Sequence, residues 1–95
     1  MKHYVFLKFK PEQDLDEAEE IIRSTFRGLD NALPWFMNPC VYRNTIKRDT
    51  NADILATVEI ESEEQLTTYL AHPLHRAMAA RLDPEVERRT TFDHK

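Results

Sequence analysis

Residues suited to acid–base chemistry gather in one short stretch in the second half of the chain. Tyr69 and His75 bracket the segment Tyr-Leu-Ala-His-Pro-Leu-His, in which Pro73 interrupts a helical pattern. Histidine titrates near neutral pH and can act as a general base, and a tyrosine hydroxyl can stabilise a developing enolate oxygen. In an unbroken helix, six residues turn by about 600°, which places the two side chains about 120° off the same face. We therefore expect the break at Pro73 to bring Tyr69 and His75 toward one cleft.

Two further candidates, His3 and Asp93, lie near the two ends of the chain. His3 alternates with Val5 and Leu7 along the first predicted strand, on the side that we expect the helices to cover. Asp93 lies near the end of the last predicted strand, which is a neighbour of the first strand in the topology described below. A carboxylate in that position can fix the tautomer of an imidazole.

Each of these four residues also has a purely structural interpretation. Tyr69 can pack on the sheet as an ordinary helix residue, and His75 can be a hydrogen bonder between elements. His3 can be a buried strand histidine that pairs with Asp93. A core filled by side chains would favour these interpretations, whereas a shared cavity would favour a working site.

The remaining histidines and the cysteine are expected to be structural. His72 directly precedes Pro73, and we expect it to hydrogen-bond backbone groups that the helix break leaves free. His72, His75, His3 and Asp93 together offer only one carboxylate and scattered imidazoles, so we predict no metal site and no cofactor. The single cysteine, Cys40, has no partner for a disulfide or a CxxC motif, and we expect a small buried strand residue.

Composition narrows the functional class. The 95 residues are 41% hydrophobic and 32% charged, which is typical of one globular domain, and we assign it residues 1–95. The formal net charge of −4 argues against a nucleic-acid binder, and the basic pair Arg88-Arg89 is too short to change that conclusion. Gly28 is the only glycine, so the Gly-rich phosphate loops of nucleotide-binding folds are excluded.

The sequence also indicates a cellular location. No apolar run approaches the roughly 18 residues that a membrane span needs. The first residues lack the apolar stretch and the small-residue cleavage site of a signal peptide. We therefore expect a cytoplasmic protein with no membrane association.

The periodicity of apolar residues predicts the order of the elements. Strands are expected at 2–10, about 40–48, about 53–60 and about 86–93. Helices are expected at 14–33, from the capping box at 62–65 through Tyr69-Leu70 to a break before Pro73, and at 73–82. A polar hairpin turn is expected at 48–51. This β-α-β-β-α-β order predicts an α+β, ferredoxin-like fold, an antiparallel sheet with helices on one face.

The second face of that sheet is too apolar for a monomer. Tyr4 and Phe6 occupy one side of the first strand, opposite the side that carries Val5 and Leu7. The third strand is likewise apolar on both faces. Two helices can cover only one face of four strands, so we predict a homodimer in which two sheets pack on each other.

Four segments of the chain carry a family resemblance: Lys2-His3 followed by Val-Phe-Leu-Lys-Phe-Lys, Glu61-Ser62, Tyr69-Leu-Ala-His-Pro-Leu-His75, and Phe92-Asp93. On these segments the chain resembles, over nearly its whole length, the stress-responsive A/B barrel domain family of dimeric α/β barrels. The resemblance implies a ferredoxin-like fold, a homodimer, and an apolar cleft between the sheet and the helices of each subunit.

The resemblance also implies roles for individual residues. A plant polyketide cyclase of this family closes a ring by aldol condensation, using a tyrosine and a histidine that correspond to Tyr69 and His75. His3 and Asp93 correspond to its supporting positions. Phe26 falls about where that enzyme has a pocket tyrosine, so the polar lining is reduced here.

Together these observations predict a homodimer that binds a small hydrophobic or aromatic molecule in a cleft. Val5, Leu7 and Phe26 are the predicted binding residues, and acid–base chemistry of the cyclase or lyase kind is the predicted activity. Two alternatives remain open: a cofactor-free monooxygenase acting on an oxidisable phenol, and a non-catalytic stress or assembly protein.

Overall fold

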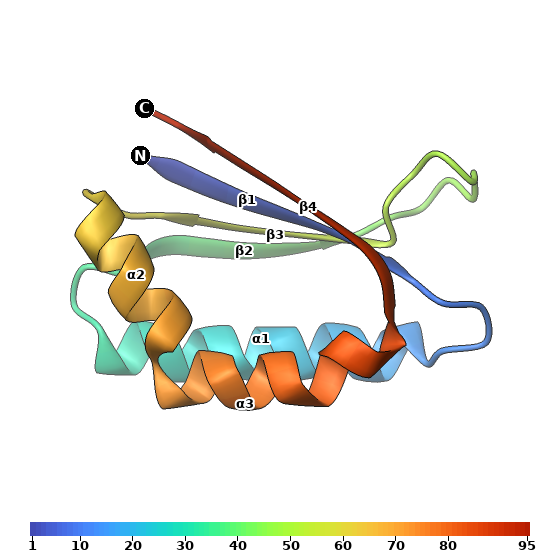
Figure 1. Cartoon of the computed structure of the whole chain (residues 1–95), viewed down its shortest axis with the longest axis horizontal. Helices are drawn as coiled ribbons and strands as arrows, with labels where there is room; N and C mark the ends of the chain where they lie inside the picture. Colours follow the sequence, from blue (N-terminus) through green and yellow to red (C-terminus); the bar gives the residue numbers. More distant parts are fainter.

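A four-stranded antiparallel sheet with every helix on one face makes up the protein, in a computed structural model that describes residues 1–95 (Figure 1). The elements follow in the order β1 Lys2–Phe9, α1 Leu15–Ala32, β2 Met37–Arg43, β3 Ile54–Glu59, α2 Glu63–Ala71, α3 Pro73–Leu82, a short 3-10 helix Asp83–Glu85, and β4 Val86–His94. The strand order across the sheet is β2-β3-β1-β4. This arrangement confirms the predicted ferredoxin-like fold. None of the helices has the length and hydropathy that crossing a membrane requires.

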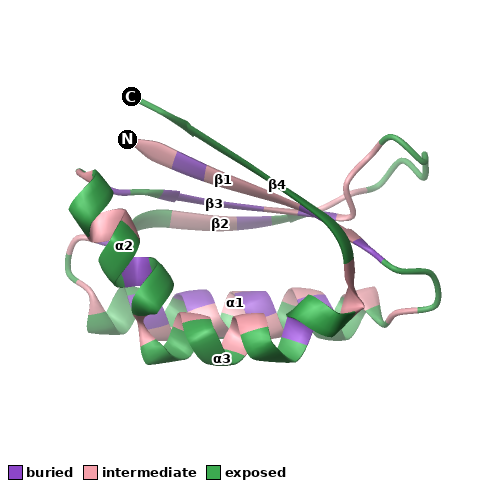
Figure 2. Ribbon diagram, in the orientation of Figure 1, coloured by how far each residue is buried: buried purple, intermediate pink, exposed green.

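The core lies between the sheet and α1 (Figure 2). The Asp14 side chain accepts a hydrogen bond from the Glu17 N–H at 3.0 Å and so caps the start of α1. The buried positions of α1 then recur at three- and four-residue steps: Ala18, Ile22, Phe26 and Leu29. They pack against the inner face of β1 and β3, where every second residue is buried or half-buried. The apolar residues that recur along the sequence are therefore the residues that pack in the core.

The pairing of β1 with β4 joins the two ends of the chain. His3 lies opposite Asp93, and Leu7 lies opposite Arg89, on the face that looks toward the helices. On the other face Tyr4 lies opposite Phe92, with ring centroids 5.9 Å apart. The alternation of a strand sends neighbouring residues to opposite faces, so the inner and outer faces of β4 carry different chemistry.

The break between α2 and α3 is built from two adjacent residues, His72 and Pro73. His72 is extended, with φ −62° and ψ 139°, as expected for a residue before proline. It ends α2 and caps α3, because its Nδ1 accepts the Leu74 N–H at 3.1 Å. The predicted structural role of His72 is thereby confirmed.

The contact between α1 and α3 is close at Gly28. A Cβ atom added to Gly28 would come within 2.9 Å of the Leu74 Cδ1. Glycine thus permits the close contact of α1 and α3.

The region around β2 differs from the prediction. The strand spans Met37–Arg43 rather than 40–48, and its register shifts between Met37 and Cys40. Asn38 adopts a positive φ of 48°, and the irregularity accommodates Pro39 on an edge strand. Cys40 is half-buried rather than buried.

The connection from β2 to β3 is also longer than the predicted hairpin turn. It covers residues 44–53, and the turn at 48–51 exists only as its tip, where the Asn51 N–H donates to the Arg48 carbonyl at 3.1 Å. The Asn44 side chain donates to the Ile46 carbonyl at 2.7 Å. Such local side-chain bonds offer the backbone an alternative to the ladder, and the strand therefore stops at Arg43.

Replacing the cap at the helix break should destabilise the protein. His72→Ala leaves the Leu74 N–H without its partner, and we expect a loss of about 1 kcal/mol. For a domain of this size that corresponds to a fall in Tm of roughly 4–8 °C. Thermal denaturation at a fixed protein concentration measures the change. His72→Asn, which restores an N-cap acceptor, is the matched control and should recover most of the loss. Unchanged stability with lost ligand binding would instead assign His72 to the site.

Candidate functional site

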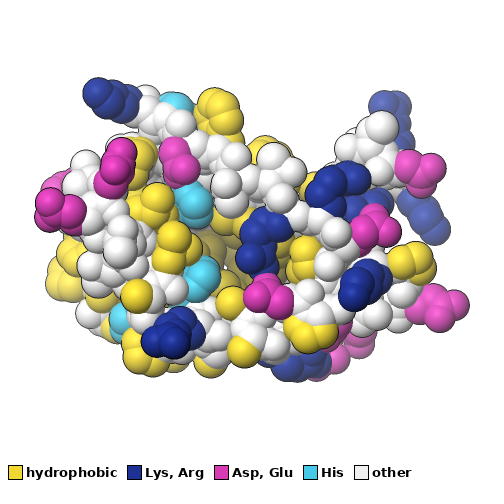
Figure 3. All heavy atoms as spheres, viewed as in Figure 1, with side chains coloured by type: hydrophobic (Ala, Val, Ile, Leu, Met, Phe, Trp, Pro, Cys, Tyr) yellow, Lys and Arg dark blue, Asp and Glu magenta, His cyan; other side chains and the backbone are white.

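A cavity of about 320 Å³ lies between the sheet and the helices. Figure 3 shows the molecule hollowed there, with apolar side chains inside the hollow and histidines at its wall. Eleven of the 16 residues that line the cavity are hydrophobic. The full lining consists of His3, Val5, Leu7, Ile22, Phe26, Ala56, Leu66, Tyr69, Leu70, His75, Met78, Ala79, Leu82, Arg89, Thr91 and Asp93. The volume lies at the small end of the range for ligand sites, so the cavity suits one small, largely apolar molecule.

The polar inner face of β4 explains why this space is not filled. Arg89, Thr91 and Asp93 follow one another along that face, and β4 is exposed at every position after Val86. Packing these side chains directly on α3 would strip water from charged and polar groups without supplying partners. In Figure 1, β4 accordingly stands away from α3, whereas α1 packs closely beside α3. The cavity lies between β4 and α3 and is lined by residues of both.

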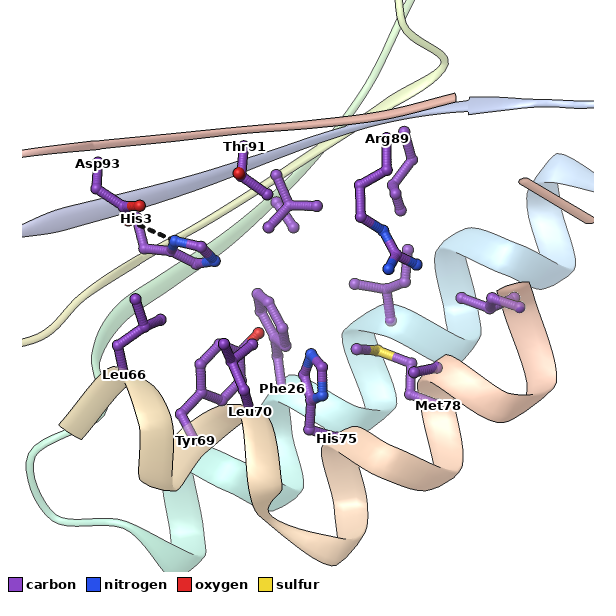
Figure 4. A pocket seen from close by; sticks show the side chains of 16 residues that line it. His3, Phe26, Leu66, Tyr69, Leu70, His75, Met78, Arg89, Thr91 and Asp93 are labelled. Carbon is purple, nitrogen blue, oxygen red and sulfur yellow. Dashed lines mark hydrogen bonds and ion pairs between the residues drawn. The ribbon is translucent and has the colours of Figure 1, made fainter. Parts of the chain in front are cut away.

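Tyr69 and His75 come together across the helix break. Their ring centroids are 4.8 Å apart and their planes are nearly perpendicular, at 74°. The Tyr69 side chain is only 1% exposed, and its hydroxyl points into the cavity in Figure 4. Burial alone raises the pKa of Tyr69 above its ordinary value. The hydroxyl therefore stays protonated at neutral pH and can donate a hydrogen bond to a bound molecule.

His3 and Asp93 form the opposite wall of the cavity. His3 is 4% exposed, and its Nδ1 lies 2.5 Å from Asp93 Oδ1 (Figure 4). An ionised carboxylate can only accept a hydrogen bond, so the proton of a neutral His3 ring resides on Nδ1 and leaves Nε2 as an acceptor. The His3 ring meets Tyr69 edge to face, with centroids 6.2 Å apart. The pair thus brings an oriented imidazole to the same cavity.

The electrostatic setting of His75 favours the neutral imidazole. Burial lowers the pKa of His75, and the positive charge of Arg89 lowers it further, as does His3. A hydrogen bond with the Leu70 backbone and the charge of Asp83 act in the opposite direction. With the pKa below its ordinary value, His75 is unprotonated at pH 7 and able to accept a proton.

All seven residues proposed from the sequence line this one cavity. They are Val5, Leu7 and Phe26 for binding and His3, Tyr69, His75 and Asp93 for chemistry. His72 is not among the lining residues, so the four-ligand metal set considered above is not assembled. The structure contains no group of three His, Cys, Asp or Glu side chains that could hold a metal ion.

Two polar residues of the cavity, Arg89 and Thr91, were missed by the sequence analysis. Arg88-Arg89 is considered there only as a basic pair for nucleic-acid binding. In the structure, Arg88 faces away from the helices and Arg89 faces the cavity. The signal that would have found them is the two-residue alternation of a strand: counting back from Asp93 gives Thr91 and Arg89. Three apolar residues of α3, Met78, Ala79 and Leu82, also face the cavity, because they recur with His75 at three- and four-residue steps.

Comparison with known proteins identifies related sequences and folds. The model of the Stress Responsive A/B Barrel Domain family matches residues 1–95 of this chain. Among curated proteins, none matches.

Solved structures of the same fold include two dimeric ferredoxin-like proteins of unknown function. The one from Jannaschia sp. CCS1 superposes with a TM-score of 0.82 at 18% identity and covers 99% of this chain and 96% of that chain. The one from Thermobifida fusca YX superposes with a TM-score of 0.79 at 22% identity and covers 96% of this chain and 85% of that chain. A hydroxynitrile lyase from Passiflora edulis superposes with a TM-score of 0.77 at 15% identity and covers 98% of this chain and 89% of that chain. At these identities the likeness establishes the fold.

The lowered pKa of His75 predicts a specific pH dependence of stability. A histidine whose pKa is lower in the folded than in the unfolded protein contributes stability above the unfolded value of about 6.5, and that contribution is lost as the pH falls through the folded pKa. We expect the NMR titration of the His75 ring to have its midpoint below 6.5. The free energy of unfolding should fall between pH 6.5 and that midpoint, and His75→Gln should remove this part of the slope. A His75 midpoint at or above 6.5 would contradict the assignment.

Proposed function

This chain belongs to the stress-responsive A/B barrel domain family, and we propose that it binds a small hydrophobic or aromatic molecule in the cavity between its sheet and its helices. We further propose acid–base chemistry of the cyclase or lyase kind at Tyr69 and His75. One observation carries the proposal: the Tyr69 hydroxyl and the His75 ring open onto the same mostly apolar cavity. A hydroxynitrile lyase with the same fold adds support for the lyase form.

The proposed reaction begins with a proton transfer. Neutral His75 takes a proton from a carbon next to a carbonyl group, and the electron pair moves onto the carbonyl oxygen to give an enolate. The Tyr69 hydroxyl donates a hydrogen bond to that oxygen, in a cavity where few other polar groups compete. In a cyclase the enolate carbon then attacks a second carbonyl, and His75 returns its proton to the oxygen that has become an alkoxide. In a lyase the steps run in reverse: His75 takes the hydroxyl proton, the carbon–carbon bond breaks to give a carbonyl and an enolate, and His75 returns the proton to the enolate carbon. His3, oriented by Asp93, supplies a second imidazole beside the Tyr69 ring.

The open cavity weighs against a purely structural role for these residues. A non-catalytic stress or assembly protein would be expected to fill the space with its own side chains. No hydrogen bond to another protein group engages the Tyr69 hydroxyl, which opens onto the cavity. A bound molecule can therefore accept a hydrogen bond from it. Oxygen uptake with a phenolic substrate would mark the monooxygenase alternative.

The outer face of the sheet supports the proposed homodimer. Tyr4 stacks beside Phe6 with ring centroids 6.4 Å apart, and Phe92 remains 58% exposed. The Thr57 hydroxyl on the same face is buried without a hydrogen-bond partner. A monomer would leave this aromatic surface in water, whereas a second copy would cover it. The solved neighbours of the same fold from Jannaschia and Thermobifida are dimeric.

The dimer is tested by placing a charge on the outer face. Analytical ultracentrifugation at micromolar concentration should give roughly twice 11.2 kDa for the unmodified protein. Phe92→Glu should shift the population toward the monomer, because it puts an uncompensated charge into the apolar contact. Ala77→Glu adds the same charge at an exposed position on α3 and should remain dimeric. An unmodified chain that sediments as a monomer would overturn the proposal.

The acid–base chemistry is tested by deuterium exchange at the α-carbon of an aromatic ketone, for example 4-phenyl-2-butanone in D₂O, followed by NMR. The protein should accelerate exchange over buffer. His75→Ala should reduce the acceleration by about 10²–10⁴-fold, since it removes the base. Tyr69→Phe should reduce it by about 10²–10³-fold, since it removes the oxyanion donor.

The exchange experiment has matched controls on the outer surface. Tyr42→Phe and His94→Ala change the same residue types outside the cavity and should retain full activity. All variants are checked as folded proteins of unchanged oligomeric state. Equal rates with and without the protein would reject the catalytic proposal. Native mass spectrometry of the purified protein then tests for a retained apolar molecule independently of turnover.

A further inference from the structure

Arg89 is a charged residue in a cavity that is otherwise largely apolar. It lies opposite Leu7 in the pairing of β1 with β4, on the face directed toward the helices. Figure 4 shows its guanidinium reaching from β4 into the space above α3, on the same side as His75. None of the acid–base steps proposed above uses this residue. Its position therefore calls for a role of its own.

The charges around the cavity leave Arg89 available to a ligand. Asp93, the only acid among the lining residues, is already paired with His3 at 2.5 Å. Arg89 is held from outside the lining by Asp83, which accepts a hydrogen bond from Nη2. A guanidinium carries five N–H donors, so this single bond leaves donors free.

The ion pair between Arg89 and Asp83 also leaves the guanidinium of Arg89 accessible to a ligand. The side chains of Arg89 and Asp83 are 44% and 53% exposed. An ion pair at such exposure contributes little stability, because water solvates both partners. Asp83 therefore holds the guanidinium only weakly, and a ligand carboxylate can compete with it for the donors. A planar carboxylate matches the remaining donors in a two-pronged geometry.

We infer that the molecule bound in this cavity is an acid: an apolar or aromatic body with a carboxylate that Arg89 binds at the mouth beside β4. This inference rests on the binding function proposed above and names the chemical class of the ligand. The carboxylate sits at Arg89 while the apolar body extends along the lining of Phe26, Leu66 and Leu70. Figure 4 shows His75 between these two ends, on the wall of the same cavity.

The arrangement also explains how the ligand would be oriented. An apolar cavity alone fixes neither end of a small molecule, since hydrophobic contact has no direction. A charge-assisted hydrogen bond at one end removes that ambiguity. With the carboxylate at Arg89, carbons close to it face His75 and Tyr69 rather than the apolar end. Arg89 is thus a specificity-determining residue, distinct from the base and the oxyanion donor.

The test compares probes that differ only in charge. Binding of 4-phenylbutanoate and of its uncharged amide, 4-phenylbutanamide, is measured by isothermal titration calorimetry on the intact protein. We expect the acid to bind the unmodified protein at least about tenfold more tightly, as a hydrogen bond between two charged groups allows. Arg89→Gln should abolish this preference while leaving the affinity for the amide unchanged. Arg76→Gln, an exposed arginine on α3 outside the cavity, changes the net charge equally and should retain the preference.

Two further variants test the geometry. Arg89→Lys keeps the charge but loses the two-pronged donor, and it should retain only part of the preference. Asp83→Asn removes the competing carboxylate and should tighten binding of the acid but not of the amide. Equal affinity of the unmodified protein for acid and amide, or a preference that survives Arg89→Gln, would overturn the carboxylate inference while the apolar binding function stands. Binding of neither probe would reject the binding function, and the inference with it.

Discussion

The interruption of the second helical segment at Pro73 is the constraint on which the site depends. Proline has no N–H and holds the residue before it in an extended conformation, so α2 must end at Ala71 and α3 must begin in a new direction. His72 makes this change of direction stable by capping α3. An unbroken helix would separate Tyr69 and His75 around its axis. The break instead places their rings in contact at the wall of one cavity.

The sheet supplies the other half of the site through its order of strands. A βαββαβ chain returns its last strand to the side of its first, which places residues separated by almost the whole sequence next to each other. His3 and Asp93 meet for this reason. The same strand, β4, carries polar side chains on its inner face and so cannot close on α3. A single edge strand therefore both provides the charged wall of the cavity and preserves its volume.

The open cavity beside Tyr69 and His75 lowers the stability of the fold. The Tyr69 hydroxyl opens onto the cavity without a hydrogen bond to another protein group, and His75 is held in a setting that disfavours its charged form. The open cavity and the disfavoured charge both cost free energy, because packing contacts and solvation are lost. The compact apolar contacts of α1 with the sheet offset that cost. Departures from ideal packing of this kind concentrate at functional sites, which supports the cavity as the proposed site.

The sequence by itself determined most of the elements and the residues proposed for the chemistry. Apolar periodicity is a local signal, so α1, the helix break and the fold class could be predicted, and the role of His72 followed from its place before Pro73. The seven proposed site residues reach the cavity because they alternate or recur on faces that periodicity identifies. What only the tertiary structure decided was the space between those faces. The start of β2 at Met37 depends on a bulge in its pairing with β3, and the presence of Arg89 in the cavity depends on the register of β4 against β1. Register is set by contacts between distant segments, and a one-residue shift would send Arg89 to the outer face; local patterns do not carry that information.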